Sequence, residues 1–262
     1  MTGPETVPSS AALPRQEWIS VDTDVEIAFM DFASTAPLRQ EAELLPRLHP
    51  DEQARYRAFT HAARRESFLA GRALLIALLA RTLGRVEPAA LRSADSGGLR
   101  YEDAPVHLNL SHSGGLAAAT VSTRPVGVDL ERLRMRPSVQ QAARVFTPAE
   151  GTRVDALPEA ERLEAFYILW TLKEAACKAA ELSLWEGLRG ARFDTAVGRA
   201  EIEAPFPRGP WAFMHAGLAS YWRIAVALRG ADPGFQIGCR RLAADGTWRE
   251  EPLTRPIYLY GD

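Results

Sequence analysis

The chain has 262 residues, of which 47% are hydrophobic and 24% charged, and its formal net charge is −2. This length allows one large domain or two smaller ones, and the composition is ordinary for a soluble globular protein. The net charge argues against a nucleic-acid-binding protein, and the longest apolar run, residues 73–80, is too short to span a bilayer.

Residues 1–17 are rich in proline, serine and alanine and are predicted to form a disordered tail. They contain no basic segment followed by an apolar one, so no signal peptide is expected. Cys177 and Cys239 lack the spacing of a metal site and the context of a disulfide. We therefore expect a cytoplasmic protein that binds no membrane.

Apolar residues alternate along 25–32, which predicts a β-strand. Pro50 and the two acids after it suit the first turn of a helix, and the apolar pattern predicts two helices or one interrupted helix over 51–83. Gly84 is a plausible stop. Between Arg55 and Arg100 lie nine arginines and three acids, a local charge of +6. This excess is either a solvated helix face or a surface for an anionic ligand or acidic partner.

Three strands are predicted over 106–110, 115–122 and 125–131, with Ser111 to Ser113 forming a turn between the first two. The helix signals that follow are a Thr-x-x-Glu capping pattern at 147–150 and a long amphipathic pattern over 158–182. Further strand candidates are 191–197, 211–216, 221–228 and 255–260. This layout predicts an α+β chain of two similar-sized subdomains, 18–124 and 125–262.

Asp129 and Glu131 are two residues apart in a predicted strand, so both carboxylates point to the same face. Burying two neighbouring carboxylates is costly unless a cation lies between them, and a hard ion such as Mg²⁺ accepts carboxylate and phosphate oxygens. The alternative is an exposed strand face with two solvated acids.

Trp170, Glu174 and Lys178 are spaced by four residues and therefore share one face of the long helix. They are either a core tryptophan beside a surface ion pair, or an aromatic anchor, an acid and a base facing a ligand. In the second case Glu174 could supply a third carboxylate to an ion and Lys178 could balance phosphate charge.

Ser111 and His112 suggest a catalytic dyad, but no G-x-S-x-G elbow surrounds the serine. Groups that hydrogen-bond a phosphate fit better than a serine hydrolase. Asn109 is most simply a turn-stabilising side chain.

Together, "NLSHS" (109–113), "GVDLE" (127–131) and "WTLKEAACK" (170–178) resemble the three ordered motifs of the Sfp-type 4′-phosphopantetheinyl transferases. The segment "FLAGRALL" (68–75) is similar to that family's N-terminal motif. The resemblance implies two α/β subdomains related by a pseudo-twofold axis, with coenzyme A bound between them. It also implies transfer of phosphopantetheine from coenzyme A to a serine of an acyl or peptidyl carrier protein, with release of adenosine 3′,5′-bisphosphate.

The resemblance further implies roles for individual residues. It implies an enzyme that acts as a monomer, with Asp129, Glu131 and Glu174 holding Mg²⁺. Glu174, directly or through water, would take the serine proton, with Glu150 as a rival, and Lys178 would contact the phosphates and assist the leaving group. Ser111, His112 and Arg55 would bind coenzyme A, and Arg72 is a further, weaker candidate for the same role.

Some positions depart from the family pattern. The Gly-Lys-Pro segment often found before the first motif is replaced by "SGGLRYEDAP" (96–105), where Arg100 is a possible substitute. Ile76 stands where an arginine is common, and the segment after the long helix, 179–188, is poor in glycine. A non-catalytic module that binds coenzyme A or a carrier protein is the alternative to the enzyme.

Overall fold

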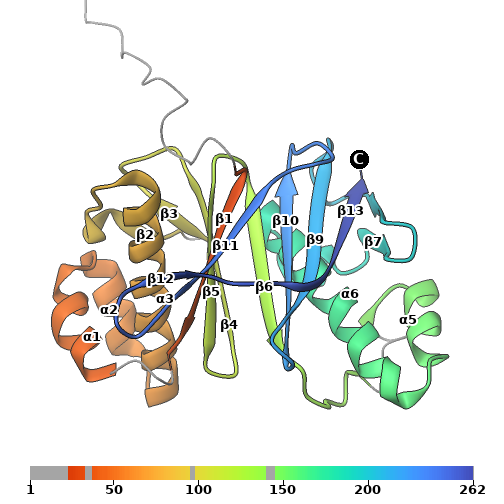
Figure 1. The fold of residues 1–262 in the computed structure, drawn as a ribbon, viewed down its shortest axis with the longest axis horizontal. Helices are drawn as coiled ribbons and strands as arrows, with labels where there is room; N and C mark the ends of the chain where they lie inside the picture. The colour runs from red at the N-terminus through yellow and green to blue at the C-terminus, as the bar shows by residue number, and fades with distance from the viewer. Residues whose placement is uncertain (1–22, 33–36, 95–97, 140–144, 262) are drawn as a thin grey trace, which may run out of the picture.

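The computed structural model describes residues 23–32, 37–94, 98–139 and 145–261. The tail predicted for 1–17 lies outside these residues. The described chain forms a mixed α/β structure in which two sheets lie face to face and helices cover the outer face of each (Figure 1). None of the described helices combines the length and apolar character that a membrane-spanning segment needs.

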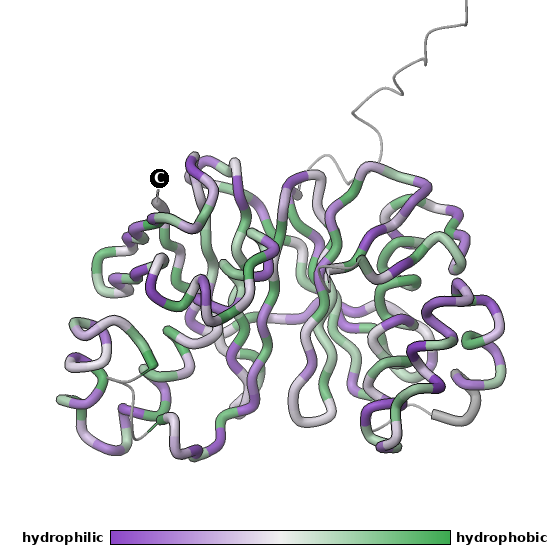
Figure 2. Tube along the Cα trace, turned by 180° about the vertical axis from the view of Figure 1, so that it is seen from behind, coloured by the Kyte–Doolittle hydropathy of each residue, from purple (hydrophilic) through white to green (hydrophobic). Residues whose placement is uncertain are grey.

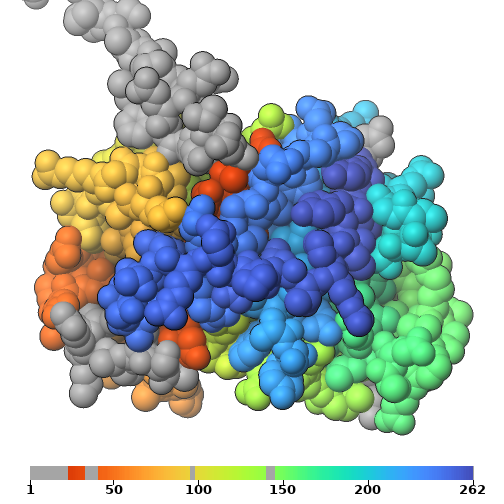
Figure 3. All heavy atoms as spheres, in the orientation of Figure 1, coloured from red at the N-terminus to blue at the C-terminus, as the bar shows by residue number. Residues whose placement is uncertain are grey.

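The first sheet has seven strands among the described residues, and at its centre β5 pairs antiparallel with both β1 and β4. In spatial order the strands are β12 (Trp248–Glu250), β11 (Ile237–Leu242), β1 (Val25–Asp31), β5 (Leu116–Ser122), β4 (His107–Ser113), β3 (Leu99–Tyr101) and β2 (Leu91–Ser93). The strand β11 pairs in parallel with β1, so a late segment of the chain completes a sheet built from early ones. Figure 3 shows this segment in blue, lying over the N-terminal part of the molecule.

The second sheet has six described strands and begins with β6 at one edge. Its spatial order is β6 (Val126–Arg132), β10 (Trp222–Arg229), β9 (Trp211–Leu218), β13 (Thr254–Gly261), β8 (Arg199–Ile202) and β7 (Ala191–Asp194). Because β6 pairs on one side only within this sheet, the backbone groups on its other side need partners from elsewhere.

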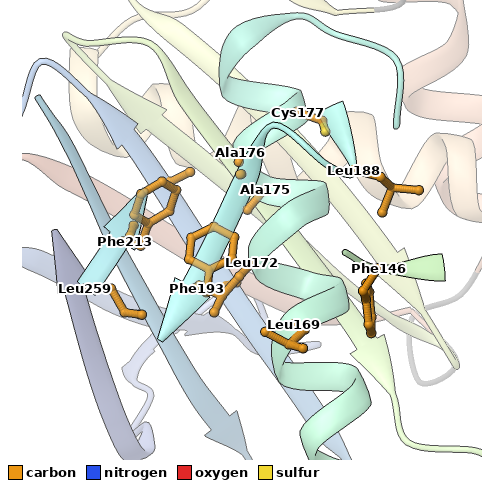
Figure 4. Packing of buried hydrophobic residues seen from close by; sticks show 14 of the residues in the cluster. Phe146, Leu169, Leu172, Ala175, Ala176, Cys177, Leu188, Phe193, Phe213 and Leu259 are labelled. Carbon is orange, nitrogen blue, oxygen red and sulfur yellow. The ribbon is translucent and has the colours of Figure 1, made fainter. Parts of the chain in front are cut away.

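Three apolar layers hold the fold together, and the hydrophobic stretches run along the strands in Figure 2. The middle layer lies between the sheets and includes Phe29 and Val128. The helix α3 covers the first sheet and α6 covers the second. Figure 4 shows Leu172 of α6 close to Phe193 and Phe213 from the second sheet.

Local signals mark several of the helix ends in the described chain. They are α1 (Pro37–Leu44), α2 (Pro50–Ala58), α3 (Ala62–Leu83), α5 (Pro148–Asp155), α6 (Glu159–Ala180) and α7 (Leu184–Gly187), with short 3₁₀ turns η1 (Leu45–Arg47) and η2 (Pro88–Ala90). The predicted break within 51–83 is real, because α2 ends at Ala58 and α3 begins at Ala62. Gly84 ends α3 with φ of 83°, and Thr147 forms the predicted capping box with Glu150.

The prediction of a turn at Ser111 to Ser113 is wrong. These residues continue β4, and the turn lies at Gly114 and Gly115, whose φ angles of 56° and 90° favour glycine. Asn109 is likewise a strand residue rather than a turn residue. The strands β2, β3, β8, β11 and β12 were not predicted. These strands are short or lack regular alternation, so nothing in their own residues marks them.

Candidate active site

The two sheets are joined along one line by three side chains of β4. Asn109 Oδ1 accepts a hydrogen bond from Val128 N at 3.1 Å, and Ser111 Oγ accepts one from Leu130 N at 3.1 Å. Ser113 Oγ accepts a third from the backbone N–H of residue 132 at 3.0 Å. The side chains of Asn109, Ser111 and Ser113, which we call the polar seam, thus take the place of a neighbouring strand for the free edge of β6.

The seam also contacts the two predicted metal ligands. Ser111 Oγ donates to Asp129 Oδ1 at 3.0 Å, and Ser113 Oγ donates to Glu131 Oε2 at 2.8 Å. Glu131 additionally pairs with Arg136, whose Nη2 lies 3.1 Å from Glu131 Oε2. Both carboxylates are therefore held by groups from outside their own strand.

A close approach between β6 and α6 brings the third motif to the same place. A Cβ atom at Gly127 would lie 2.0 Å from the carbonyl oxygen of Ala175, so only glycine allows this contact. The helix lies on the face of β6 that carries Asp129. As a result Lys178 Nζ reaches Asp129 Oδ1 at 2.7 Å and stands 4.0 Å from Glu174 Oε2.

The electrostatics of this cluster depart from those of a solvated surface. Burial raises the pKa of Glu174 to about 7; Lys178 opposes this rise, and the charges of Asp129 and Glu131 add to it. Burial alone would lower the pKa of Lys178, but the neighbouring carboxylates Asp129, Glu174 and Glu131 raise it overall. Three carboxylates therefore face two cations, Lys178 and Arg136, and the cluster carries surplus negative charge when all three are ionised.

Trp170 belongs to the core side of this helix rather than to the cluster. Its ring stacks on Phe166 with centroids 5.7 Å apart, and it packs against the apolar layer between α6 and the second sheet. Of the two interpretations of this motif, a core tryptophan fits Trp170, while Glu174 and Lys178 face the carboxylates of β6.

The cluster has the chemistry of a hard-cation site but not a finished geometry. Within the described residues, no three histidine, cysteine, aspartate or glutamate side chains are arranged to ligate one ion. Asp129 and Glu131 are instead turned toward Lys178 and Arg136. Asp129 Oδ2, however, is buried and has no hydrogen-bond partner in the described chain. An orphaned carboxylate oxygen beside a carboxyl group of raised pKa fits a Mg²⁺ ion with oxygen ligands.

A polar cavity of about 370 Å³ lies on the opposite face of β4, between this strand and helices α2 and α3. It is lined by Arg55, Phe59, Arg64, Ser67, Phe68, Arg72, Ser93, Leu99, Leu110 and His112. The alternation of β4 sends His112 toward this cavity and Ser111 toward β6. Ser111 and His112 are therefore not adjacent parts of one dyad.

The arginines around the cavity differ in exposure and in whether they already form an ion pair. Arg72 is 4% exposed and forms a buried ion pair with Glu52, and its Nη2 donates to Ser93 Oγ at 3.0 Å. Arg55 and Arg64 have exposed side chains and make no ion pair with any described residue. Burial and the Lys178 charge lower the pKa of His112. The two free arginines are thus the cations available to an anion in this cavity.

Arg100 and Glu150 are held by other partners. Arg100 pairs with Glu181 at the end of α6. Glu150 is 1% exposed, caps α5 and forms an ion pair with the fully buried Lys173 at 3.0 Å. A carboxylate enclosed in this way has a structural role. Glu150, the alternative to Glu174 as the general base, therefore lies outside the cluster.

Several contributors were missed at the level of sequence. Ser113 was quoted in a motif without a role, and Arg64 was only one of nine arginines. Arg136 contacts Glu131, five residues away, in the segment after β6. The alternation of Asn109, Ser111 and Ser113 was the available signal, because period two is the mark of a strand.

Residues 125–227 match the model of the 4′-phosphopantetheinyl transferase superfamily. The chain is 36% identical over 151 residues to the 4′-phosphopantetheinyl transferase HetI of Nostoc sp., covering 55% of this chain and 63% of the relative. It is 28% identical over 206 residues to a 4′-phosphopantetheinyl transferase of Bacillus subtilis, covering 76% and 89%. Over these regions the chain is similar to 4′-phosphopantetheinyl transferases.

A third relative is the 4′-phosphopantetheinyl transferase AcpT of Escherichia coli O157:H7, with 36% identity over 125 residues. The match covers 47% of this chain and 62% of that relative. The chain thus spans somewhat less than two thirds of HetI and AcpT and most of the Bacillus subtilis transferase. The superfamily match itself, 125–227, contains β6 and α6, the two elements that carry the carboxylate cluster.

Proposed function

We propose that this chain transfers 4′-phosphopantetheine from coenzyme A to a serine of an acyl or peptidyl carrier protein and releases adenosine 3′,5′-bisphosphate. The observation that carries the proposal is the cluster of Asp129, Glu131, Glu174 and Lys178 at the junction of the two sheets. Phosphoryl transfer depends mainly on positioning and charge neutralisation; here the carboxylates would hold a cation, and Lys178 supplies a positive charge.

Glu174 and Lys178 are the proposed catalytic residues. The serine oxygen of the carrier protein forms a bond to the β-phosphorus of coenzyme A, and the bond from this phosphorus to the bridging oxygen breaks. Glu174, which faces the same cluster, takes the serine proton directly or through water. Lys178, kept protonated by its neighbours, stabilises the negative charge on the departing oxygen.

Asp129, Glu131 and Glu174 would hold Mg²⁺, which neutralises the pyrophosphate charge when bound. In this role Asp129 would use Oδ2, the oxygen that Lys178 does not contact, and Glu131 would release Arg136. The buried, unpartnered Asp129 Oδ2 supports the assignment, since a cation would satisfy it.

Coenzyme A would occupy the cavity beside α2 and α3, with Arg55 and His112 contacting its phosphates. Arg72 lines the same cavity, but its guanidinium already pairs with Glu52, so its proposed contribution is to shape the wall. Ser111 stays in the proposed set because its hydroxyl lies 3.4 Å from Lys178 Nζ. The excess of arginine in this half suits an acidic carrier protein.

We further propose that the chain is of the Sfp type and acts as a monomer, with a pseudo-twofold relation between the halves 18–124 and 125–262. Two observations support this relation. The long helices α3 and α6 each have 22 residues, and each covers the outer face of one sheet. Under this division the second half also contributes one segment, strands β11 and β12, to the first sheet.

A non-catalytic module that binds coenzyme A or a carrier protein is the second candidate. The absence of three converging metal ligands among the described residues favours it. The intact set of three carboxylates and one lysine favours the enzyme, because a binding module has no need to hold surplus negative charge.

The test is mass spectrometry of an apo carrier protein incubated with this protein, coenzyme A and Mg²⁺. We expect the carrier to gain one phosphopantetheine, and we expect the gain to disappear with EDTA or with Asp129→Asn. Asp232→Asn is the matched control, because Asp232 is an exposed aspartate in the loop between β10 and β11. No gain with fatty-acid, polyketide or nonribosomal-peptide carriers, while coenzyme A still binds, would establish the binding module instead.

A further inference from the structure

We propose that Ser111 and Ser113 are positioning residues that hold the carboxylates of Asp129 and Glu131 from the opposite sheet. The inference rests on the proposed function, since it assigns these carboxylates to a metal. It is carried by hydroxyl groups that each make two bonds at once, one to the backbone of β6 and one to a carboxylate on it.

The register of the seam fixes which carboxylate each serine contacts. Asn109, Ser111 and Ser113 follow one another at intervals of two along β4, and the N–H groups they serve follow at the same interval along β6. A shift of one residue in either strand would point every seam side chain to the wrong face. The seam therefore sets the position of the carboxylates along the strand as well as their distance from the first sheet.

Ser113 is the most strongly anchored member. Its carbonyl oxygen accepts a hydrogen bond from Trp222 Nε1 at 3.1 Å, which ties the end of β4 to β10 of the second sheet. Its hydroxyl then donates to Glu131 at 2.8 Å. Glu131 is thus oriented by a side chain whose own backbone is held by the sheet that contains Glu131.

Ser111 has a different set of neighbours. It is buried, and its hydroxyl lies between Asp129 Oδ1 and Lys178 Nζ, at 3.0 and 3.4 Å. Because this hydroxyl donates to Oδ1, it restricts rotation of the carboxylate and leaves Oδ2 as the oxygen without a partner in the described chain. Ser111 thereby presents one defined oxygen of Asp129 to a cation.

Asn109 supplies the matched control. It makes the same kind of bond to a β6 N–H, at 3.1 Å, and among the described residues it forms no hydrogen bond with either carboxylate. Asn109→Ala and Ser113→Ala each leave one N–H of β6 without its partner, so both should lower the thermal unfolding temperature by similar amounts. Only the serine variant should affect the metal.

The experiment measures Mn²⁺ binding to the purified full chain by electron paramagnetic resonance, together with the unfolding temperature of each variant. We expect Ser113→Ala and Ser111→Ala to raise the apparent Kd for Mn²⁺ by about tenfold, the effect of losing one hydrogen bond to a charged group. We expect Asn109→Ala to stay within about twofold of the wild type, and Ser113→Thr, which keeps the hydroxyl, to restore binding.

Equal Mn²⁺ affinity in Ser113→Ala and Asn109→Ala would overturn the inference, whether or not the protein transfers phosphopantetheine. Loss of Mn²⁺ binding in Asn109→Ala would overturn it too, since seam stability alone would then explain the effect. A selective loss in the serine variants, in a protein that modifies no carrier, would support the positioning role and refute the proposed transfer. The two failures are therefore distinguishable.

Discussion

Replacing Gly127 by alanine should separate α6 from β6 and disable the cluster. The new Cβ would lie 2.0 Å from the oxygen of Ala175 and 2.6 Å from the nitrogen of Ala179, whereas real Cβ contacts are essentially never below 3.0 Å. Both obstacles are backbone atoms, so the helix has to retreat by about 1 Å. Lys178 Nζ, now 2.7 Å from Asp129 Oδ1, would then leave normal hydrogen-bond range.

The magnitude follows from two general relations. Overpacking a core contact costs about 1–3 kcal/mol, which for a chain of this size lowers the unfolding temperature by about 2–12 °C. A displacement of about 1 Å among catalytic groups reduces turnover by about a hundredfold. Differential scanning calorimetry and the carrier-modification assay measure the two effects.

Gly84→Ala serves as the control for this prediction. Gly84 has a φ of 83° and nothing within 4 Å of a Cβ atom, so alanine there costs about 1 kcal/mol of backbone strain far from the cluster. We expect it to lower the unfolding temperature and to leave turnover unchanged. Wild-type stability and turnover in Gly127→Ala would refute the packing argument.

Two further predictions concern pH. His215 is 3% exposed with both ring nitrogens unpartnered in the described chain, and burial followed by the Arg223 charge lowers its pKa to about 3. As pH falls, the unfolded state binds a proton at this histidine before the folded state does, so the free energy of unfolding decreases from pH 6.5 toward 3. His215→Leu should reduce the loss of unfolding free energy between pH 7 and pH 5 by about 2 kcal/mol, measured in urea titrations. An unchanged pH dependence in this variant would contradict the prediction. The raised pKa of Glu174 acts in the opposite direction: without metal, stability falls as pH rises from 4.5 through about 7, by about 3 kcal/mol. Glu174→Gln should therefore stabilise the EDTA-treated protein at pH 8 and change its stability little at pH 4.5. A variant that is less stable than the wild type at pH 8 would show that ionised Glu174 does not destabilise the folded protein.

Elements with strong local chemistry were predicted from the sequence. The break between α2 and α3, the stop at Gly84 and the capping box of Thr147 and Glu150 depend on residues a few positions apart. The long helix α6 and the strand β6 were predicted for the same reason. Within them, the sequence also determined that Asp129 and Glu131 share a strand face and that Glu174 and Lys178 share a helix face.

The tertiary structure decided which of these faces meet. Ser111 and Asp129 are 18 residues apart, and no pattern in the intervening sequence predicts that the Ser111 hydroxyl binds the Asp129 carboxylate. The contact exists because β6 is an edge strand whose N–H groups need partners, and β4 of the other sheet supplies them. Likewise, Lys178 reaches Asp129 because Gly127 lets a helix lie directly on the strand. Such contacts depend on the packing of whole layers, whereas a sequence pattern reports only the residues within one or two turns or strands.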